Sequence, residues 1–222
     1  MHGSERPEKR GLIMRIAVVT EVSTKEKNAS VLSALEGRGH EVFNLGMKGV
    51  ASEPELTYIH TGFLGAVLLC GGCVDLVVGG CGTGQGFLNS VLQYPGVCCG
   101  LIESPLDAWL FAQINGGNCV SLALNKGFGW AGDINLKLIF DQLFSVEWGL
   151  GYPAHRKESQ QRSRAALQGI SRVTHVHFPK IVERAEDSVV QPALSFPGVL
   201  DFLSARACAE VRTACQKRHA AP

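Results

Sequence analysis

The sequence has no long uninterrupted apolar run, almost no net charge and few aromatic residues. Of its 222 residues 7% are aromatic, and 21 Lys and Arg balance 20 Asp and Glu to a net charge of +1. Because a bilayer span takes roughly 18 to 20 consecutive apolar residues, no membrane segment is expected. A charge this close to zero also gives no general attraction to nucleic acid. We therefore expect neither a membrane nor a nucleic-acid partner, and an anionic ligand has to be held locally.

The sequence also lacks the features of a secreted protein. The charged segment 1–13 leads into no apolar core of signal-peptide length, and we interpret it as a flexible N-terminal arm. Met14 stands directly before the first expected strand and is an alternative initiation site. Eight cysteines without secretion features are typical of reduced thiols in the cytoplasm, where we place the protein.

Short apolar runs alternate with amphipathic segments between residues 14 and 150. The runs predict buried strands at 15–20, 41–45, 75–79, 97–102 and 119–124. The segments between and after them predict five helices. These are expected at 24–38, from Pro54 to 70, from the end of the glycine-rich segment at 86 to about 94, at 105–115 and at 133–146. Because parallel pairing needs crossover connections, this order predicts a three-layer α/β/α, Rossmann-like sandwich with a five-stranded parallel sheet.

The alternating pattern ends near Gly149. A polar helix is expected over 155–169 and another over 199–218, with an irregular stretch that holds Pro179, Pro192 and Pro197 between them. We interpret residues 151–222 as a helical C-terminal extension that packs on a partner subunit or covers the site.

A glycine-rich segment follows the third expected strand and reads Gly-Gly-Cys-Gly-Thr-Gly-Gln-Gly over 79–86. Ligands of parallel α/β sheets bind at the carboxyl ends of the strands. Gly82, Gly84 and Gly86 permit close approach of the backbone, and a helix that begins here presents N–H groups to an anion. A tight turn that needs glycine for packing alone is the alternative. A dinucleotide fingerprint is disfavoured because its glycines normally follow the first strand and these follow the third. A P-loop is disfavoured because no Gly-Lys-Ser/Thr follows the glycines.

Cys81 distinguishes this segment from a plain anion cradle. A thiol near a helix N-terminus is expected to have a lowered pKa, because the positive end of the helix dipole favours the thiolate. A thiolate beside backbone N–H groups is suited to removing a proton α to a carbonyl, while the N–H groups stabilise the enediolate oxygen. A buried cysteine at a strand end is the alternative interpretation.

The run from Asp75 to Gly86, Asp-Leu-Val-Val-Gly-Gly-Cys-Gly-Thr-Gly-Gln-Gly, resembles the core motif of B-type ribose-5-phosphate isomerases and of the related galactose-6-phosphate isomerase subunits. The resemblance extends from Arg15 to about Asn118, and more loosely to Phe144. It implies an intramolecular oxidoreductase of carbohydrate and pentose phosphate metabolism, which needs no metal or cofactor. Because family members build each site from two subunits, it also implies a homodimer or a dimer of dimers.

The resemblance assigns roles to individual residues. Cys81 is the base that moves a proton between carbons 1 and 2 of the open-chain sugar, and Thr83 assists ring opening or contacts a hydroxyl. The groups that hold the enediolate oxygens are the backbone of Gly82, Gly84 and Gly86, together with Asn115. For the phosphate, the family uses C-terminal arginines, which here are Arg156, Arg162 and Arg164. A guanidinium donates two parallel hydrogen bonds to phosphate, and we favour Arg156 because it is nearest to the α/β domain.

The chain departs from the family pattern at several positions. Glu21-Val22 stands where the family has Asp-His, so Glu21 keeps a carboxylate for sugar hydroxyls while the histidine is absent. A second family histidine, used to open the furanose ring, falls at Ile114, and a family arginine is replaced by Cys98. A substrate that is open-chain or cyclises differently needs no ring-opening group. A catalytically inactive sugar-phosphate-binding protein of the same fold is the alternative function.

Two further motifs carry weaker signals. Cys70 and Cys73 have CxxC spacing, but no second pair follows at zinc-finger distance. His175 and His177 lie on one side of an extended segment, but the sequence shows no third ligand. We therefore expect no metal site.

Overall fold

The computed structural model describes residues 13–49 and 53–220, and it confirms the predicted α/β/α fold. Five parallel strands form one sheet in the order β2-β1-β3-β5-β4. Their bounds are Arg15–Val19 (β1), Glu41–Asn44 (β2), Leu76–Cys81 (β3), Cys99–Ile102 (β4) and Cys119–Ala123 (β5). The N-terminal arm predicted at 1–13 lies outside the described residues, apart from Ile13.

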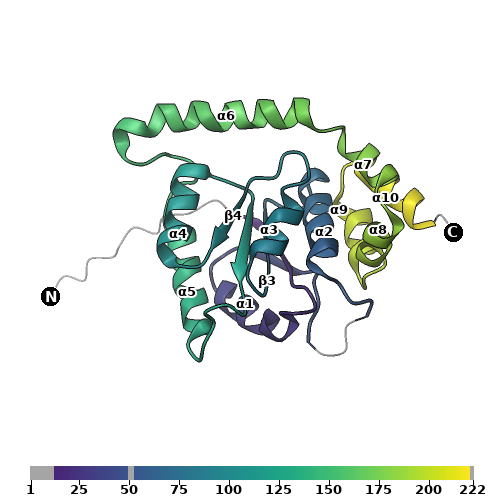
Figure 1. Ribbon diagram of the computed structural model, residues 1–222, viewed down its shortest axis with the longest axis horizontal. Helices are drawn as coiled ribbons and strands as arrows, with labels where there is room; N and C mark the ends of the chain where they lie inside the picture. Colours follow the sequence, from purple (N-terminus) through teal and green to yellow (C-terminus); the bar gives the residue numbers. More distant parts are fainter. Residues whose placement is uncertain (1–12, 50–52, 221–222) are drawn as a thin grey trace.

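Helices cover both faces of the sheet (Figure 1). One face carries α1 (Asn28–Leu35), α4 (Pro105–Leu110) and α5 (Gly132–Leu143), and the other carries α2 (Tyr58–Cys70) and α3 (Gln85–Val91). Side chains alternate between the faces along each strand. In β3, Val78 therefore joins the core under α1 and α5, while Val77 and Cys81 join the core under α2 and α3.

The helix predicted to begin at Pro54 begins instead at Tyr58, and that prediction was wrong. A capping box sets the start. The Thr57 side chain accepts a hydrogen bond from the backbone N–H of His60, and His60 Nδ1 accepts one from the Thr57 N–H at 2.9 Å. Histidine here stands where Glu or Gln completes the usual box, a pairing that the sequence pattern does not signal.

The segment after residue 150 is more helical than predicted. Its elements are a 3₁₀ turn, η3 (Ala154–Arg156), and five helices: α6 (Lys157–Thr174), α7 (Phe178–Arg184), α8 (Asp187–Leu194), α9 (Val199–Arg206) and α10 (Ala209–Ala220). The predicted irregular stretch was wrong because Pro179 occupies the first turn of α7, where proline needs no hydrogen-bonded N–H. The single helix predicted at 199–218 is two helices, α9 and α10.

Helices α7 to α10 pack on α2 of their own chain. Phe178 of α7, Val190 of α8 and Val199 of α9 are buried in the same core as Phe63 of α2. The rings of Phe63 and Phe178 stack with centroids 6.4 Å apart. Most of the extension therefore belongs to the body of one subunit, and its packing on a partner stays a prediction.

Helix α6 behaves differently from the other helices of the extension. It has no buried residue and runs as a long rod past the amino ends of the strands (Figure 1). Arg164 ties it to the body through a 3.0 Å bond to the Ile114 carbonyl, and Ser171 Oγ accepts from the Gly96 N–H at 3.0 Å. Within the described ranges, no helix is long and apolar enough to cross a membrane.

Candidate active site

The carboxyl ends of β1, β3 and β5 meet at one edge of the sheet, and the loops after them form the candidate site. Cys81 is the last residue of β3 and lies opposite Ala123 of β5. Its side chain faces the α2 and α3 side of the sheet, and the residue is 6% exposed. The thiol is therefore buried directly below the loops in which a ligand is expected.

A tight turn separates Cys81 from the helix that follows. The Cys81 carbonyl accepts hydrogen bonds from the N–H groups of Gly84 at 3.2 Å and Leu124 at 3.0 Å. Helix α3 begins only at Gln85, so the thiol belongs to the strand and lies one turn ahead of the helix. In the described chain, the N–H groups of Gly82 and Thr83 donate to no other group. They are donors left available beside the thiol.

The three glycines of the turn serve different purposes. Gly84 has a φ of +76°, and a Cβ there would lie 2.5 Å from Leu101. Gly86 lies under the Tyr58 ring, 3.0 Å from where its Cβ would be. At Gly82 the nearest atom would be 3.4 Å away, which is ordinary contact. Packing therefore requires glycine at position 84 and leaves little room for a larger residue at position 86. A Cβ at position 82 would make only ordinary contacts with the neighbouring loops.

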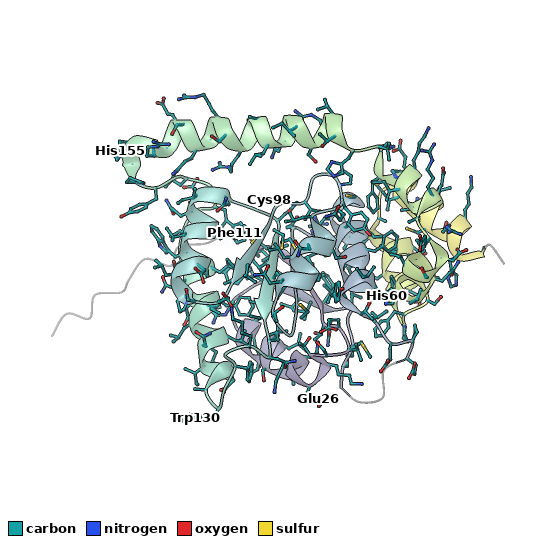
Figure 2. The ribbon with its side chains drawn as sticks, viewed as in Figure 1. Glu26, His60, Cys98, Phe111, Trp130 and His155 are labelled. Atoms are coloured by element: carbon teal, nitrogen blue, oxygen red, sulfur yellow. The ribbon has the colours of Figure 1, made fainter. Side chains whose placement is uncertain are left out.

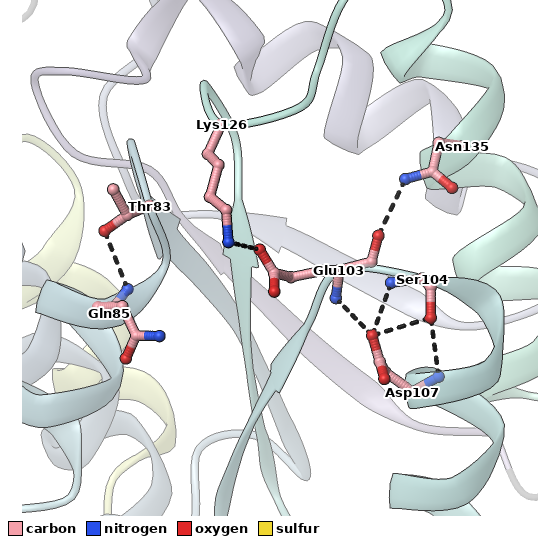
Figure 3. A network of polar contacts seen from close by, with 7 residues as sticks. All are labelled: Thr83, Gln85, Glu103, Ser104, Asp107, Lys126 and Asn135. Carbon is pink, nitrogen blue, oxygen red and sulfur yellow. Dashed lines mark hydrogen bonds and ion pairs between the residues drawn. The ribbon is translucent and has the colours of Figure 1, made fainter.

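Thr83 is exposed on the turn, and its Oγ1 accepts a hydrogen bond from the Gln85 N–H at 3.3 Å (Figure 3). The hydroxyl hydrogen stays available to a ligand. Glu21 differs, because it is 2% exposed and its carboxylate is occupied by its own loop. It accepts from the Ser23 N–H at 3.0 Å, from the Ser23 hydroxyl and from the Thr24 hydroxyl at 3.2 Å. Glu21 thus shapes the loop after β1.

Three polar residues at this edge, Ser23, Asn125 and Lys126, were not predicted from the sequence. Asn125 Nδ2 donates to the Ser23 carbonyl at 3.0 Å, and both side chains lie beside Gly82. The Gly82 carbonyl accepts from the N–H groups of Asn125 at 3.0 Å and Lys126 at 2.8 Å. Their position directly after predicted strands was the signal that could have found them.

Lys126 also belongs to a polar network around the ends of β4 and β5 (Figure 3). Its Nζ lies 2.7 Å from Glu103 Oε1, and Asn135 Nδ2 donates to the Glu103 carbonyl at 3.2 Å. These side chains border a pocket of about 140 Å³ that reaches down to Leu122 and Ile139. Because Leu122 and Ile139 belong to the core under α5, the pocket lies on the face of the sheet opposite the Cys81 thiol.

Asn115 and Arg156 lie away from Cys81 within one chain. Asn115 ends the π-helix η2 (Phe111–Asn115) and precedes β5, whereas Cys81 lies opposite the last residue of β5. Arg156 adjoins His155, which Figure 2 places on the far side of the molecule from Trp130 and Glu26 in the carboxyl-end loops. The two residues are therefore at the amino-end edge of the sheet.

The three candidate arginines have different surroundings. Arg164 donates to the Ile114 carbonyl at 3.0 Å and holds the end of η2. Arg162 pairs with Glu158 on the exposed face of α6 at 3.6 Å. Arg156 is exposed and forms no ion pair with any described residue. Of the three, only Arg156 has a guanidinium group that forms no hydrogen bond or ion pair with another residue of the described chain.

The two histidines of the weaker motif have separate contacts. His175 Nδ1 lies 3.0 Å from the Ser171 carbonyl, and His177 Nε2 lies 3.5 Å from Glu210. In the part of the chain that the structure describes, no three His, Cys, Asp or Glu side chains converge where they could hold a metal ion.

The family model described as Ribose/Galactose Isomerase matches residues 16–139, more than half of the chain. The chain belongs to the ribose/galactose isomerase family. This family comprises sugar isomerases. A comparison with curated proteins gives no match.

Two solved structures resemble nearly the whole chain. A 4-deoxy-L-threo-5-hexosulose-uronate ketol-isomerase complexed with a tartrate is 35% identical, with a TM-score of 0.89, and the match covers 92% of this chain and 99% of that one. A ribose-5-phosphate isomerase of Vibrio parahaemolyticus is 38% identical, with a TM-score of 0.89 and coverage of 93% and 99%. Both therefore include counterparts of the C-terminal extension.

A ribose-5-phosphate isomerase of Thermotoga maritima shares the fold. It is 23% identical, with a TM-score of 0.53, and the match covers 67% of this chain and 98% of that one. The match thus leaves about a third of this chain uncovered.

Proposed function

We propose that the chain interconverts the aldose and ketose forms of a phosphorylated sugar through an enediolate, with Cys81 as its base. The observation that carries the proposal is the position of this thiol. It ends β3 at the carboxyl edge and is followed by a turn whose Gly82 and Thr83 N–H groups donate to no described group. Membership of a sugar isomerase family supports the reaction class.

The chemistry follows from these groups. The Cys81 thiolate removes a proton from the carbon beside the carbonyl, and the electron pair moves onto the carbonyl oxygen. The proton then returns to the neighbouring carbon. The N–H groups of Gly82 and Thr83 donate to the oxygen that gains charge. Gly84 does not join them, because its N–H already donates to the Cys81 carbonyl.

A second copy of the chain completes the site in this proposal. Asn115 and Arg156 lie at the amino-end edge of their own subunit, opposite Cys81, so a homodimer has to bring them to the thiol of its partner. The exposed helix α6 supports such an assembly, because 18 residues with no buried side chain gain little stability within one subunit. Arg156 of the partner subunit would then contact the phosphate.

Lys126 is one cation of the same subunit at the carboxyl edge, where an anionic substrate is expected. Its backbone N–H is bonded to the Gly82 carbonyl, and its ammonium group lies at the carboxyl edge beside Glu103. A phosphate or carboxylate that reached the edge would compete with Glu103 for this ammonium group. We therefore expect Lys126 to contribute to substrate binding and Cys81 to contribute to turnover.

A keto-uronate is the second candidate substrate. The ketol-isomerase of a hexosulose-uronate shares the C-terminal extension with this chain, as does the ribose-5-phosphate isomerase of Vibrio parahaemolyticus. A uronate carries a carboxylate in place of phosphate. Val22 and Ile114 stand where the family has histidines, and the one at Ile114 is used to open the furanose ring. Their absence favours a substrate that needs no such ring opening.

The test is a turnover assay of the purified chain with C4 to C6 sugar phosphates and hexosulose-uronates. We expect one class to be isomerised by the wild type, and Cys81→Ser to lose at least about a hundredfold in kcat, as removal of a general base does. Thr83→Val is a matched change in the same turn and should retain more activity. Binding without turnover of every sugar would instead indicate a catalytically inactive protein of this fold.

A further inference from the structure

Four of the eight cysteines gather where the end of α2 meets the turn between α9 and α10. Cys70 ends α2, and Cys73 follows it after two glycines. Cys208 lies in the turn between the two C-terminal helices, and Cys215 lies within α10. The CxxC motif, which has no role in the proposed isomerisation, is thus joined by two thiols from a distant part of the sequence.

Backbone contacts bring Cys73 and Cys208 together around Gly71. The Cys208 N–H donates to the Gly71 carbonyl at 2.8 Å. A Cβ at Gly71 would lie 3.2 Å from Cys73 Sγ and 3.3 Å from the Cβ of Ala207, the residue before Cys208. The sulfur of Cys73 and the chain that carries Cys208 therefore lie against the same point of the backbone.

The four thiols differ in accessibility. Cys208 is exposed, Cys70 is half-buried, and Cys73 and Cys215 are fully buried. Burial, reinforced by the neighbouring thiols, raises the pKa of Cys73 to about 11 and the pKa values of Cys70 and Cys215 to about 12. These three are protonated at neutral pH, so an oxidant from solvent meets Cys208 first.

Cys73 is the better placed of the two CxxC thiols to react with an oxidised Cys208. The Cys70 Sγ is held by a bond to the Pro95 carbonyl at 3.3 Å. Cys73 instead has two cations nearby, Arg15 and Arg206, whose charges favour its thiolate. Arg15 also donates to the Gly72 carbonyl at 3.0 Å, which fixes the loop that carries Cys73.

We propose that Cys208 and Cys73 form an oxidation site that hydrogen peroxide converts to an intramolecular disulfide. Peroxide transfers one oxygen to the Cys208 sulfur, which gives a sulfenic acid and releases one water. The Cys73 sulfur then attacks the Cys208 sulfur. The S–S bond forms, the S–O bond breaks, and the oxygen leaves as water with the Cys73 proton. Two thiols and one peroxide thus yield one disulfide and two waters.

The cross-link would fasten the C-terminal helices to the core. Cys73 lies between α2 and β3, and Cys208 lies between α9 and α10, so the bond closes a long loop of the chain. Long closed loops restrict the unfolded chain strongly. Oxidation is therefore expected to raise the unfolding temperature of the protein by several degrees without involving Cys81.

The test treats the full-length protein with stoichiometric hydrogen peroxide, blocks remaining thiols with N-ethylmaleimide and maps peptides by mass spectrometry without reduction. We expect a peptide pair joined through Cys73 and Cys208, and a rise in unfolding temperature that dithiothreitol reverses. Cys208→Ser should abolish both results, whereas Cys70→Ser should keep them. Because Cys208 is exposed, its serine variant is expected to fold.

Three outcomes would overturn the proposal. Cys208 could stop at sulfenic or sulfinic acid in the wild type, it could join a second chain, or the peroxide-induced rise in unfolding temperature could persist in Cys208→Ser. None of these readouts depends on isomerase activity.

Discussion

The side-chain amide of Asn125 donates to the Ser23 carbonyl at 3.0 Å, which joins the loop after β5 to the loop after β1 across the turn that follows Cys81. Gly82 lies between them, and its carbonyl binds the N–H groups of Asn125 and Lys126. Three loops at the carboxyl edge thus form one unit, which holds the free N–H groups of the turn in place. The position of the N–H donors in the candidate site therefore depends on these joined loops.

Breaking the link between these loops should reduce catalysis. Asn125→Ala removes one hydrogen bond, which is worth about 0.5–1.5 kcal/mol, so kcat/KM should fall roughly three- to tenfold. Gln93→Ala is the matched control, because the Gln93 side-chain amide donates to the Asn89 carbonyl at 3.0 Å outside the loops of the carboxyl edge. Steady-state kinetics of both variants decide the point, and equal losses in both would contradict the role of the Asn125 link.

Gly84 and Gly82 should differ sharply in their tolerance of a methyl group. Gly84→Ala places a side chain at a φ of +76° and 2.5 Å from Leu101, so we expect a loss of about 1–3 kcal/mol in the free energy of unfolding. Gly82→Ala meets only ordinary contacts and should unfold close to the wild-type temperature. Thermal unfolding by circular dichroism measures both. Equal stability of the two variants would show that the turn is not held as described.

A composite site predicts that two inactive variants rescue one another. Cys81→Ala removes the base, and Asn115→Ala removes a residue that we assign to the partner's site. In a random mixture half of the dimers are mixed, and each of these has one intact site, so activity should return to about a quarter of wild type. The activity of each variant alone and of the mixture after subunit exchange is measured. An inactive mixture that contains mixed dimers would refute the shared site.

His40 should make the folded state less stable in mild acid. Burial, with a smaller effect of Arg38, lowers the pKa of this imidazole. Its ring is tilted against the Phe144 ring with centroids 4.4 Å apart, and its Nδ1 accepts from the Met14 N–H. The unfolded chain then binds more protons, so stability is full above the unfolded pKa of about 6.5 and falls as pH drops below it. Urea unfolding at several pH values, compared with His40→Gln, checks this. The variant should lose less stability between neutral and acidic pH, and an unchanged slope would exclude His40 as the cause.

Local patterns predicted the sheet and the position of Cys81. Most strands are short apolar runs, and the glycine-rich turn directly follows the third of them. The helices around prolines were less predictable. Pro179 was interpreted as a breaker although it lies in a first turn, and Pro54 was interpreted as a helix start although a Thr57–His60 capping box begins the helix.

The assignment of site residues shows a different limit. Gly86 was interpreted as a glycine for ligand approach, but it lies under the Tyr58 ring, a tertiary contact with no signature in the spacing of the motif. The separation of Asn115 from Cys81 could have been foreseen. Asn115 precedes a strand and Cys81 ends one, and in a parallel sheet these positions lie at opposite edges.

If Cys81 removes a substrate proton, that proton can exchange with solvent during turnover. The protein is incubated in D2O with the substrate found in the turnover assay, and NMR follows deuterium at carbon 2. We expect incorporation by the wild type and by Thr83→Val, and none above background by Cys81→Ala. Isomerisation without deuterium incorporation, or undiminished incorporation by Cys81→Ala, would contradict this role of Cys81.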